Sequence, residues 1–239
     1  MISKMSKLEL ERRIVDVCLG RYNGNLAAVL LFGSYNTGHF REGISDIDSI
    51  ILFKETDNVD FKSEPEKLRK ELSDVKLSIQ HFHTLKDYFD YIQDKGSWAS
   101  WITVVNGSKV IYKTREFEEF KERLQNNPIS KEKLAKYLKQ KDKFELDGYF
   151  KERREWDLTK AIFAHIRRKL QVMNYLAGNS PEFDYDTCLT NLNGEVRDKD
   201  RLVNLGEAYE KRRALSEDEV KEYVGYAKKL TGKLVKELK

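Results

Sequence analysis

Two short motifs contain the residue types best suited to chemistry. The first is Gly33-Ser34, which directly follows an apolar run. A turn at the end of a strand can point backbone amides and a hydroxyl outward, and oriented amides of this kind hold phosphate groups. The second is Ser45-Asp46-x-Asp48, which leads into another apolar run. Phosphate-binding groups and two carboxylates therefore stand close together in the sequence.

The spacing of Asp46 and Asp48 predicts a shared site. Side chains alternate along a strand, so residues two apart lie on the same face. Two carboxylates side by side repel each other unless a divalent cation lies between them. Magnesium that bridges two carboxylates and a triphosphate is the usual apparatus for in-line transfer of a phosphoryl or nucleotidyl group. We therefore predict that Asp46 and Asp48 bind Mg²⁺ and act in catalysis.

The elements that must position these motifs follow from apolar patterns in the first half of the chain. Strand and helix patterns alternate there, which indicates an α/β layer. Thr84 is expected to cap a helix whose apolar stripe follows it. The predicted elements are a helix over 5–20, strands over 27–32, 47–53, 75–82 and 109–112, and a helix after Thr84.

The second half of the chain is almost entirely helical in pattern from Ser130 onward. Ser216 and Glu219 form a capping-box signature that predicts a final helix to the C-terminus. Pro128 marks the best boundary, because proline ends one helix before the next begins. We expect an α/β (α+β) fold with a mixed-sheet domain over 1–127 and an all-α helical bundle over 128–239.

Composition excludes several classes of protein. The chain has 239 residues, a net charge of +4 and two cysteines, Cys18 and Cys188. Its longest apolar run, 26–32, is far too short to span a bilayer, so we expect no membrane association. The cysteines form no metal-ligand cluster and no secretory signal is evident, which favours a cytoplasmic protein. Residues 1–127 carry a net charge of −1 and residues 128–239 a net charge of +5.

The two motifs together resemble the DNA polymerase β-like nucleotidyltransferase superfamily, with Gly33, Ser34, Asp46 and Asp48 at the signature positions. The resemblance covers roughly residues 8–125. It implies that the Gly-Ser turn holds a nucleoside triphosphate and that the aspartates bind magnesium. It also implies a mixed sheet with helices on one side. Within this motif we assign Ser45, beside the aspartates, to the nucleotide-binding group.

One departure from the family pattern concerns a third carboxylate on a later strand. In the family it helps to hold the metal and to activate the attacking hydroxyl. The matching positions here are Ser78 and Gln80, and neither is acidic. Strand alternation predicts that His81 and His83 lie on the opposite face from this pair, where a structural role is favoured.

The second half resembles the helical substrate-binding domain of kanamycin-type and lincosamide nucleotidyltransferases, which is related to the HEPN bundle. Those enzymes place a catalytic glutamate on an early helix of that domain. The resemblance therefore implies a general base in the first long segment after the boundary. Glu145 is the favoured candidate, and Asp147 and Glu152 are alternatives.

The function favoured by the sequence is transfer of a nucleoside monophosphate from an NTP, with ATP preferred, to a hydroxyl acceptor with Mg²⁺ and release of pyrophosphate. The expected partners are the nucleotide and a small-molecule acceptor. One alternative is an antitoxin-type regulatory protein that binds nucleotide at a catalytically impaired site. Another is a nucleotidyltransferase that acts on tRNA or protein, which the basic second half favours. The sequence leaves the oligomeric state open, a homodimer included.

Overall fold

The computed structural model describes residues 5–36, 45–57, 59–143, 155–180, 184–192 and 199–239. The chain forms two compact units. The first comprises Met1–Tyr91 and Thr103–Pro128, and the second comprises Ile92–Ile102 and Ile129–Lys239. The break between Pro128 and Ile129 is one residue from the domain boundary predicted between residues 127 and 128. The sequence did not indicate that Ile92–Ile102 belongs with the helical unit.

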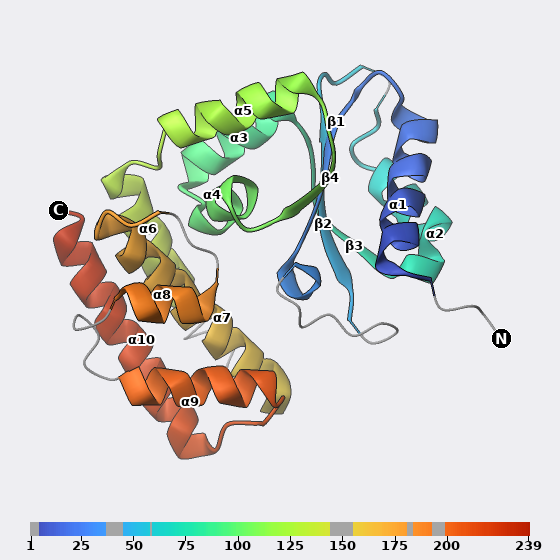
Figure 1. Cartoon of the computed structure of the whole chain (residues 1–239). Coiled ribbons are helices and arrows are strands. Elements are labelled where there is room, and N and C mark those ends of the chain that lie inside the picture. The colour runs from blue at the N-terminus through green and yellow to red at the C-terminus, as the bar shows by residue number, and fades with distance from the viewer. Residues whose placement is uncertain (1–4, 37–44, 58, 144–154, 181–183, 193–198) are drawn as a thin grey trace. The chain divides into compact units, whose positions relative to one another are not determined.

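A mixed four-stranded sheet forms the centre of the described first unit (Figure 1). Its strand order is β3-β2-β1-β4, in which β2 and β3 run parallel and the other pairs run antiparallel. All four strands were predicted from their apolar patterns, with ends that differ by no more than two residues. The strands are β1 (Leu26–Phe32), β2 (Ile47–Phe53), β3 (Leu77–Thr84) and β4 (Lys109–Lys113).

Helices cover both faces of this sheet, so the expectation of helices on one side was wrong. The reason is visible in β1 and β2, whose apolar residues are buried at consecutive positions and therefore need cover on both faces. Helices α1 (Lys7–Tyr22) and α2 (Glu64–Glu71) lie against one face (Figure 1). Helices α3 (Leu85–Lys95) and α5 (Arg115–Asn126) lie against the other.

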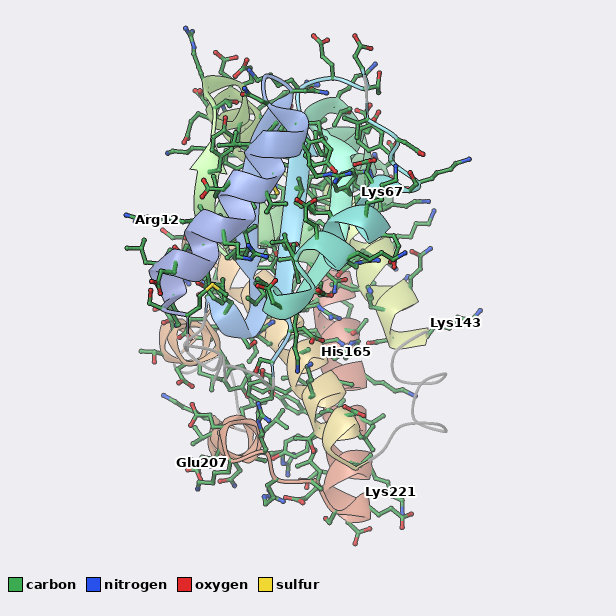
Figure 2. All side chains as sticks on the ribbon, turned by 90° about the vertical axis from the view of Figure 1, so that its right-hand side faces the viewer. Arg12, Lys67, Lys143, His165, Glu207 and Lys221 are labelled. Carbon is green, nitrogen blue, oxygen red and sulfur yellow. The ribbon has the colours of Figure 1, made fainter. Side chains whose placement is uncertain are left out.

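The core beneath α1 and α2 consists of inward-facing strand residues and aromatic side chains. The ring of Tyr22 on α1 packs edge-on against Phe53 and Phe82, with ring centroids 5.1 and 6.0 Å apart. The outer surfaces of α1 and α2 carry charged side chains such as Arg12 and Lys67 (Figure 2). This division between an apolar inner stripe and a charged outer face holds both helices on the sheet.

A bulge in β3 changes which side chains share a face. The pairing of β2 with β3 shifts its register between Ser49 and Ile50, so that Ser49 pairs with Ile79 and Ile50 with His81. The bulged residue interrupts alternation. Ile79 and Phe82 therefore both join the core on the α1 side.

The predicted placement of the two β3 histidines was wrong as a consequence of this bulge. Phe82 packs toward α1, so its neighbours His81 and His83 turn to the other face. Ser78 and Gln80 lie on that same face. Simple alternation would have separated the histidines from Ser78 and Gln80, and the extra residue removes the separation.

Two predicted helix starts are confirmed by their hydrogen bonds. The Thr84 hydroxyl oxygen accepts from the backbone N–H of Asp87 at 3.0 Å and opens α3. Ser216 and Glu219 form the expected capping box, with Glu219 accepting from the Ser216 backbone N–H at 2.8 Å. Such a cap stabilises a helix by about 1 kcal/mol because it satisfies backbone donors that lack a helical partner.

The regular elements described in the second unit are all helices, in agreement with the almost entirely helical pattern predicted for this half of the chain. Helix α7 is packed by three others, α8, α9 and α10. Trp98 and Trp101 of α4 lie 5.2 and 5.6 Å from the ring of Tyr175 on α7, which explains why Ile92–Ile102, with the first part of α4, groups with this unit. No helix in the described ranges is both long and apolar enough to cross a membrane. The helices are α4 (Trp98–Val105), α6 (Lys131–Lys141), α7 (Glu155–Leu176), α8 (Tyr185–Asn191), α9 (Lys199–Glu210) and α10 (Glu217–Glu237).

Candidate active site

The Gly-Ser turn follows β1 directly. Gly33, Ser34 and Tyr35 form a single turn of 3₁₀ helix, closed by a hydrogen bond from the Asn36 N–H to the Gly33 carbonyl at 3.2 Å. Gly33 has a φ of +67°, in the left-handed region that glycine adopts without steric cost. The glycine is therefore required by the backbone conformation of the turn.

Asp48 lies beside this turn. Its backbone is opposite Phe32 in the antiparallel pairing of β1 and β2, one residue before Gly33. A Cβ atom on Gly33 would lie only 2.6 Å from Asp48 Oδ2. The missing side chain of Gly33 thus creates the space into which the Asp48 carboxylate points.

Asp46 stands immediately before β2 and is exposed, whereas Asp48 is half-buried within the strand. Ser45, also half-buried, precedes it at the start of the described segment. The alternation argument therefore applies to Asp48 alone, because Asp46 has no strand pairing in the sheet. A shared metal site of Asp46 and Asp48, with Ser45 in the nucleotide-binding group, stays a prediction.

Gln80 is one of the two positions, with Ser78, at which the resemblance implies a carboxylate, and it contacts Asp48 directly. Its side-chain Nε2 donates to Asp48 Oδ1 at 3.0 Å and to Ser78 Oγ at 2.9 Å. Ser78 is itself the register partner of Asp48 across the parallel β2–β3 pair. The sequence named both Ser78 and Gln80 as matching positions, and the contact between Gln80 and Asp48 is visible only in the structure.

The donor set on this face suits magnesium that arrives with a nucleotide. Mg²⁺ prefers oxygen ligands and is commonly held by one or two carboxylates together with substrate phosphates. Asp48 and Asp46, two residues apart, would provide these one or two carboxylates. Among the residues that the structure describes, no cluster of three or more acidic, histidine or cysteine side chains could form an all-protein metal cage. The residues present therefore fit a cation shared with a triphosphate.

A buried polar contact anchors the Gly-Ser turn to α1. The Tyr35 hydroxyl donates to Glu11 Oε1 at 2.6 Å, and Lys109 Nζ of β4 donates to the same oxygen at 2.7 Å. Burial and the hydrogen bond to Glu11 raise the pKa of Tyr35, so the phenol keeps its proton. Sequence reasoning missed this group, because Glu11, Tyr35 and Lys109 are far apart in the chain.

His81 and His83 take part in an aromatic cluster with Tyr88. The ring of His83 stacks on Tyr88 at 5.6 Å, and His81 lies 4.8 Å from the same ring. Burial, followed by the charge of His83, lowers the pKa of His81 to about 4. Burial also lowers the pKa of His83. Both rings are therefore neutral at pH 7 and pack between the sheet and α3.

The three candidates for the general base, Glu145, Asp147 and Glu152, lie outside the described residues. Their assignment stays a prediction. Just before them, Asp142 at the end of α6 accepts from His165 Nε2 at 2.7 Å and from Lys169 Nζ at 2.8 Å. Burial opposes ionisation of Asp142, but the His165 hydrogen bond and the Lys169 charge outweigh it and lower its pKa.

That buried group has an evident structural role. Lys169 and His165 are almost fully enclosed on α7, and Asp142 ties them to the end of α6. A buried lysine needs a charged or polar partner, because an isolated charge is strongly disfavoured away from water. The contact therefore holds α6 against α7.

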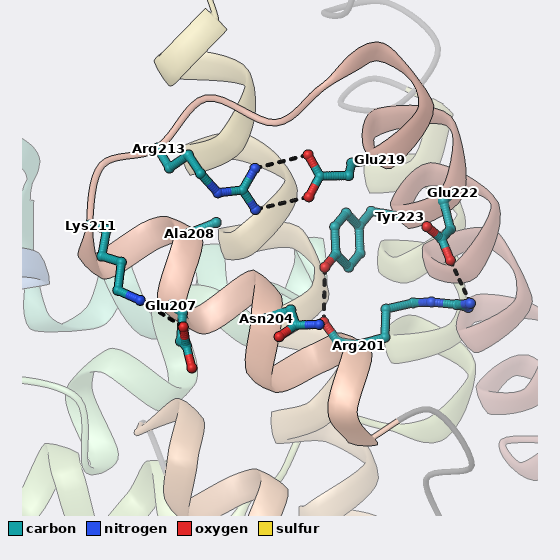
Figure 3. Close-up of a pocket in the computed structure, with 9 residues that line it drawn as sticks. All are labelled: Arg201, Asn204, Glu207, Ala208, Lys211, Arg213, Glu219, Glu222 and Tyr223. Carbon is teal, nitrogen blue, oxygen red and sulfur yellow. Dashed lines mark hydrogen bonds and ion pairs between the residues drawn. The ribbon is translucent and has the colours of Figure 1, made fainter.

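A charged pocket of about 450 Å³ lies between α9 and α10 in the second unit (Figure 3). Three of its lining cations are paired with carboxylates. Arg213 makes two contacts to Glu219 at 2.8 and 2.9 Å, and the other pairs are Lys211–Glu207 and Arg201–Glu222. Positive and negative charges balance in this lining, so the pocket gives little support to an RNA-binding surface.

Comparison with known proteins places the chain in a family. Residues 11–170 match the family model described as a nucleotidyltransferase domain. Comparison with the curated proteins gave no significant match.

Two solved structures extend the comparison. The structure of spectinomycin adenyltransferase AAD(9) from Enterococcus faecialis with ATP and spectinomycin superposes with a TM-score of 0.58 at 12% identity, covering 93% of this chain and 98% of that one. A toxin–antitoxin structure with AMP-PNP gives a TM-score of 0.35 at 22% identity, over 57% of this chain and 95% of that one. The first likeness supports the fold of the whole chain. The family match confirms the resemblance predicted from the two motifs: the chain belongs to the nucleotidyltransferase domain family.

Proposed function

We propose that this protein transfers a nucleoside monophosphate from an NTP, with ATP preferred, to a hydroxyl of a small-molecule acceptor and releases pyrophosphate. The observation that carries the proposal is the Asp48 carboxylate, which points into the space left by Gly33 at the end of β1. This arrangement brings an anionic metal ligand to a turn suited to phosphate. Family membership supports the same reaction class.

The residues of the first unit have separate roles in this proposal. The turn at Gly33 and Ser34 binds the terminal phosphates through backbone amides and the hydroxyl. Asp46 and Asp48 hold Mg²⁺, with Ser45 beside them. A Mg²⁺ ion held by these residues would supply positive charge to offset the negative charge of the triphosphate. Tyr35 keeps the turn in place through its contact with Glu11.

The acceptor and its activation belong to the proposal as well. An acceptor hydroxyl becomes an effective nucleophile when a base removes its proton, which is typically worth about 10²–10⁴-fold in rate. Gln80 cannot act as this base, because an amide does not accept the proton. Glu145 is the proposed base. The AAD(9) structure contains spectinomycin, so spectinomycin belongs in a first acceptor panel.

The direct test is pyrophosphate release from ATP and Mg²⁺ with a panel of acceptors. We expect turnover by the wild type, and for Asp48→Asn a loss of roughly 100-fold or more, because several kcal/mol of charge stabilisation disappear. Asp74→Asn is the matched control, since Asp74 is an exposed carboxylate of the same unit that pairs with Arg13. Circular dichroism without metal should show that Asp48→Asn keeps the wild-type fold, so that its loss of turnover reports on the chemistry. Equal activity of both variants would contradict the proposal.

A second candidate function is nucleotide binding without transfer. The contact that favours it is Gln80 Nε2 to Asp48 Oδ1, which places a neutral amide where the family pattern has an acid. Under this alternative, ATP binds with Mg²⁺ but no acceptor yields pyrophosphate. Singly replacing Glu145, Asp147 and Glu152 by their amides separates the two functions: a large loss of turnover in one variant supports transfer.

A further inference from the structure

The contact between Gln80 and Asp48 has a defined orientation. A carboxylate only accepts hydrogen bonds, so the group that Gln80 presents to Asp48 must be its NH₂. That NH₂ has two hydrogens, one directed at Asp48 Oδ1 and the other at Ser78 Oγ. Both donors of the amide are therefore satisfied by neighbours on the same face of the sheet.

This arrangement holds Asp48 in place without any cation. One carboxylate oxygen, Oδ1, accepts from Gln80. The other, Oδ2, points to the space at Gly33. An acidic side chain at position 80 would instead repel Asp48, and a cation would be needed to hold the two together. Gln80 replaces that repulsion with an attraction.

We propose that Gln80 is a positioning residue that restricts the site to a divalent cation delivered with a nucleotide. It fixes Asp48 and at the same time keeps the negative charge of the face too low to retain a free cation. The triphosphate then supplies the remaining oxygen ligands. The inference rests on the proposed function, because it assumes that Asp48 serves a cation and a nucleotide.

The proposal predicts that a carboxylate added at position 80 lets the cation bind before any nucleotide does. Gln80→Glu should bind Mn²⁺, used as a probe for Mg²⁺, roughly 10- to 100-fold more tightly than the wild type when no nucleotide is present. Gln80→Met is the matched control, because it removes the amide and adds no charge. It should bind Mn²⁺ alone no more tightly than the wild type. Gln80 is exposed, so both variants should fold, which circular dichroism can check.

Stability gives a readout that does not depend on turnover. Without a cation, Gln80→Glu should unfold at a lower temperature than the wild type, because its new carboxylate repels Asp48. Adding Mn²⁺ should raise the unfolding temperature again and reverse this loss. The gain in Mn²⁺ affinity should vanish in the double variant Gln80→Glu/Asp48→Asn, since the two carboxylates bind the cation together.

The experiment is calorimetry of the full chain with Mn²⁺ alone, and with Mn²⁺ and AMP-PNP. An unchanged Mn²⁺ affinity in Gln80→Glu overturns the inference. A gain in Mn²⁺ affinity of equal size in Gln80→Met also overturns it. So does a gain that persists in the double variant Gln80→Glu/Asp48→Asn. If the wild type fails to bind AMP-PNP, the proposed function is wrong. If AMP-PNP binds and Gln80→Glu changes nothing, only the role of Gln80 is wrong.

Discussion

At the scale of single residues, Gly33 couples a backbone conformation to the position of Asp48. Replacing Gly33 by alanine forces a side chain into the left-handed region and places Cβ 2.6 Å from Asp48 Oδ2. We expect a loss of about 1–2 kcal/mol in the free energy of unfolding from the backbone alone. ATP affinity should fall as well, because the Asp48 carboxylate must move. Urea unfolding and calorimetry measure the two effects.

Gly20 offers a matched control for this substitution. It lies in α1, and apart from its chain neighbours and the adjacent backbone of its own helix no atom lies within 4 Å of the place where its Cβ would be. Gly20→Ala should therefore stabilise the protein, by about 0.5–1 kcal/mol, because alanine restricts the unfolded chain more than glycine. ATP affinity should be unchanged. A Gly33→Ala variant as stable as Gly20→Ala would contradict the proposed crowding at Asp48.

At the scale of elements, the turn after β1 depends on its anchor to α1. Tyr35→Phe removes the hydroxyl that donates to Glu11 at 2.6 Å. We expect a loss of about 1–2 kcal/mol in the free energy of unfolding, since the acceptor is charged. We also expect weaker ATP binding, because the Gly33-Ser34 turn loses its connection to the helix. Parallel measurements of unfolding and of ATP affinity test both expectations.

Tyr22→Phe is the control for this effect. The Tyr22 hydroxyl also donates to a carboxylate, Glu64, at 2.8 Å, but it joins α1 to α2 and not to the turn. Its loss should lower stability by a similar amount and leave ATP affinity intact. Equal affinity losses in the two variants would show that Tyr35 acts only through general stability.

The packing of β3 against α3 should make stability depend on pH. Burial lowers the pKa of His81 from 6.5 to about 4 in the folded protein. Between these values the unfolded chain binds more protons than the folded one, so stability falls as the pH drops from about 6.5 to 4. His83 contributes in the same direction. His81→Phe removes one titrating ring and should give a smaller fall across this range, measured by urea unfolding at a series of pH values.

The acidic side chain Glu64 acts mainly at lower pH than His81. Glu64, bound by Lys67 and Arg21, has its pKa lowered from 4.5 to about 2. Its stabilising contribution is present above pH 4.5 and is lost as the pH falls toward 2. An identical pH dependence of the wild type and His81→Phe between pH 6.5 and 4 would show that His81 does not titrate with folding.

At the scale of the whole molecule, the division into two units does not follow a single cut in the sequence. Ile92–Ile102 packs with the second unit, where Trp98 and Trp101 contact Tyr175. A chain that ends at residue 128 should therefore expose these two tryptophans. We expect a red-shifted tryptophan emission and lower solubility relative to the full chain. An emission maximum equal to that of buried tryptophan would contradict this reading of the boundary.

The sequence alone determined the features that depend on neighbouring residues. Apolar periodicity predicted the four described strands of the sheet, and the caps at Thr84 and Ser216 marked where helices begin. The Gly33-Ser34 motif with its aspartates was sufficient to predict the family. These signals are local, since a turn, a cap or an alternating strand is encoded within a few positions.

Only the tertiary structure decided which distant residues meet. The bulge in β3 moved His81 to the face of Ser78, although alternation had separated them. The donation from Gln80 to Asp48, and from Tyr35 to Glu11, depends on strand register and on how α1 packs against the sheet. Register and packing minimise the free energy of the whole domain, and a one-residue shift changes the face of every side chain that follows. No local pattern in the sequence reports that choice.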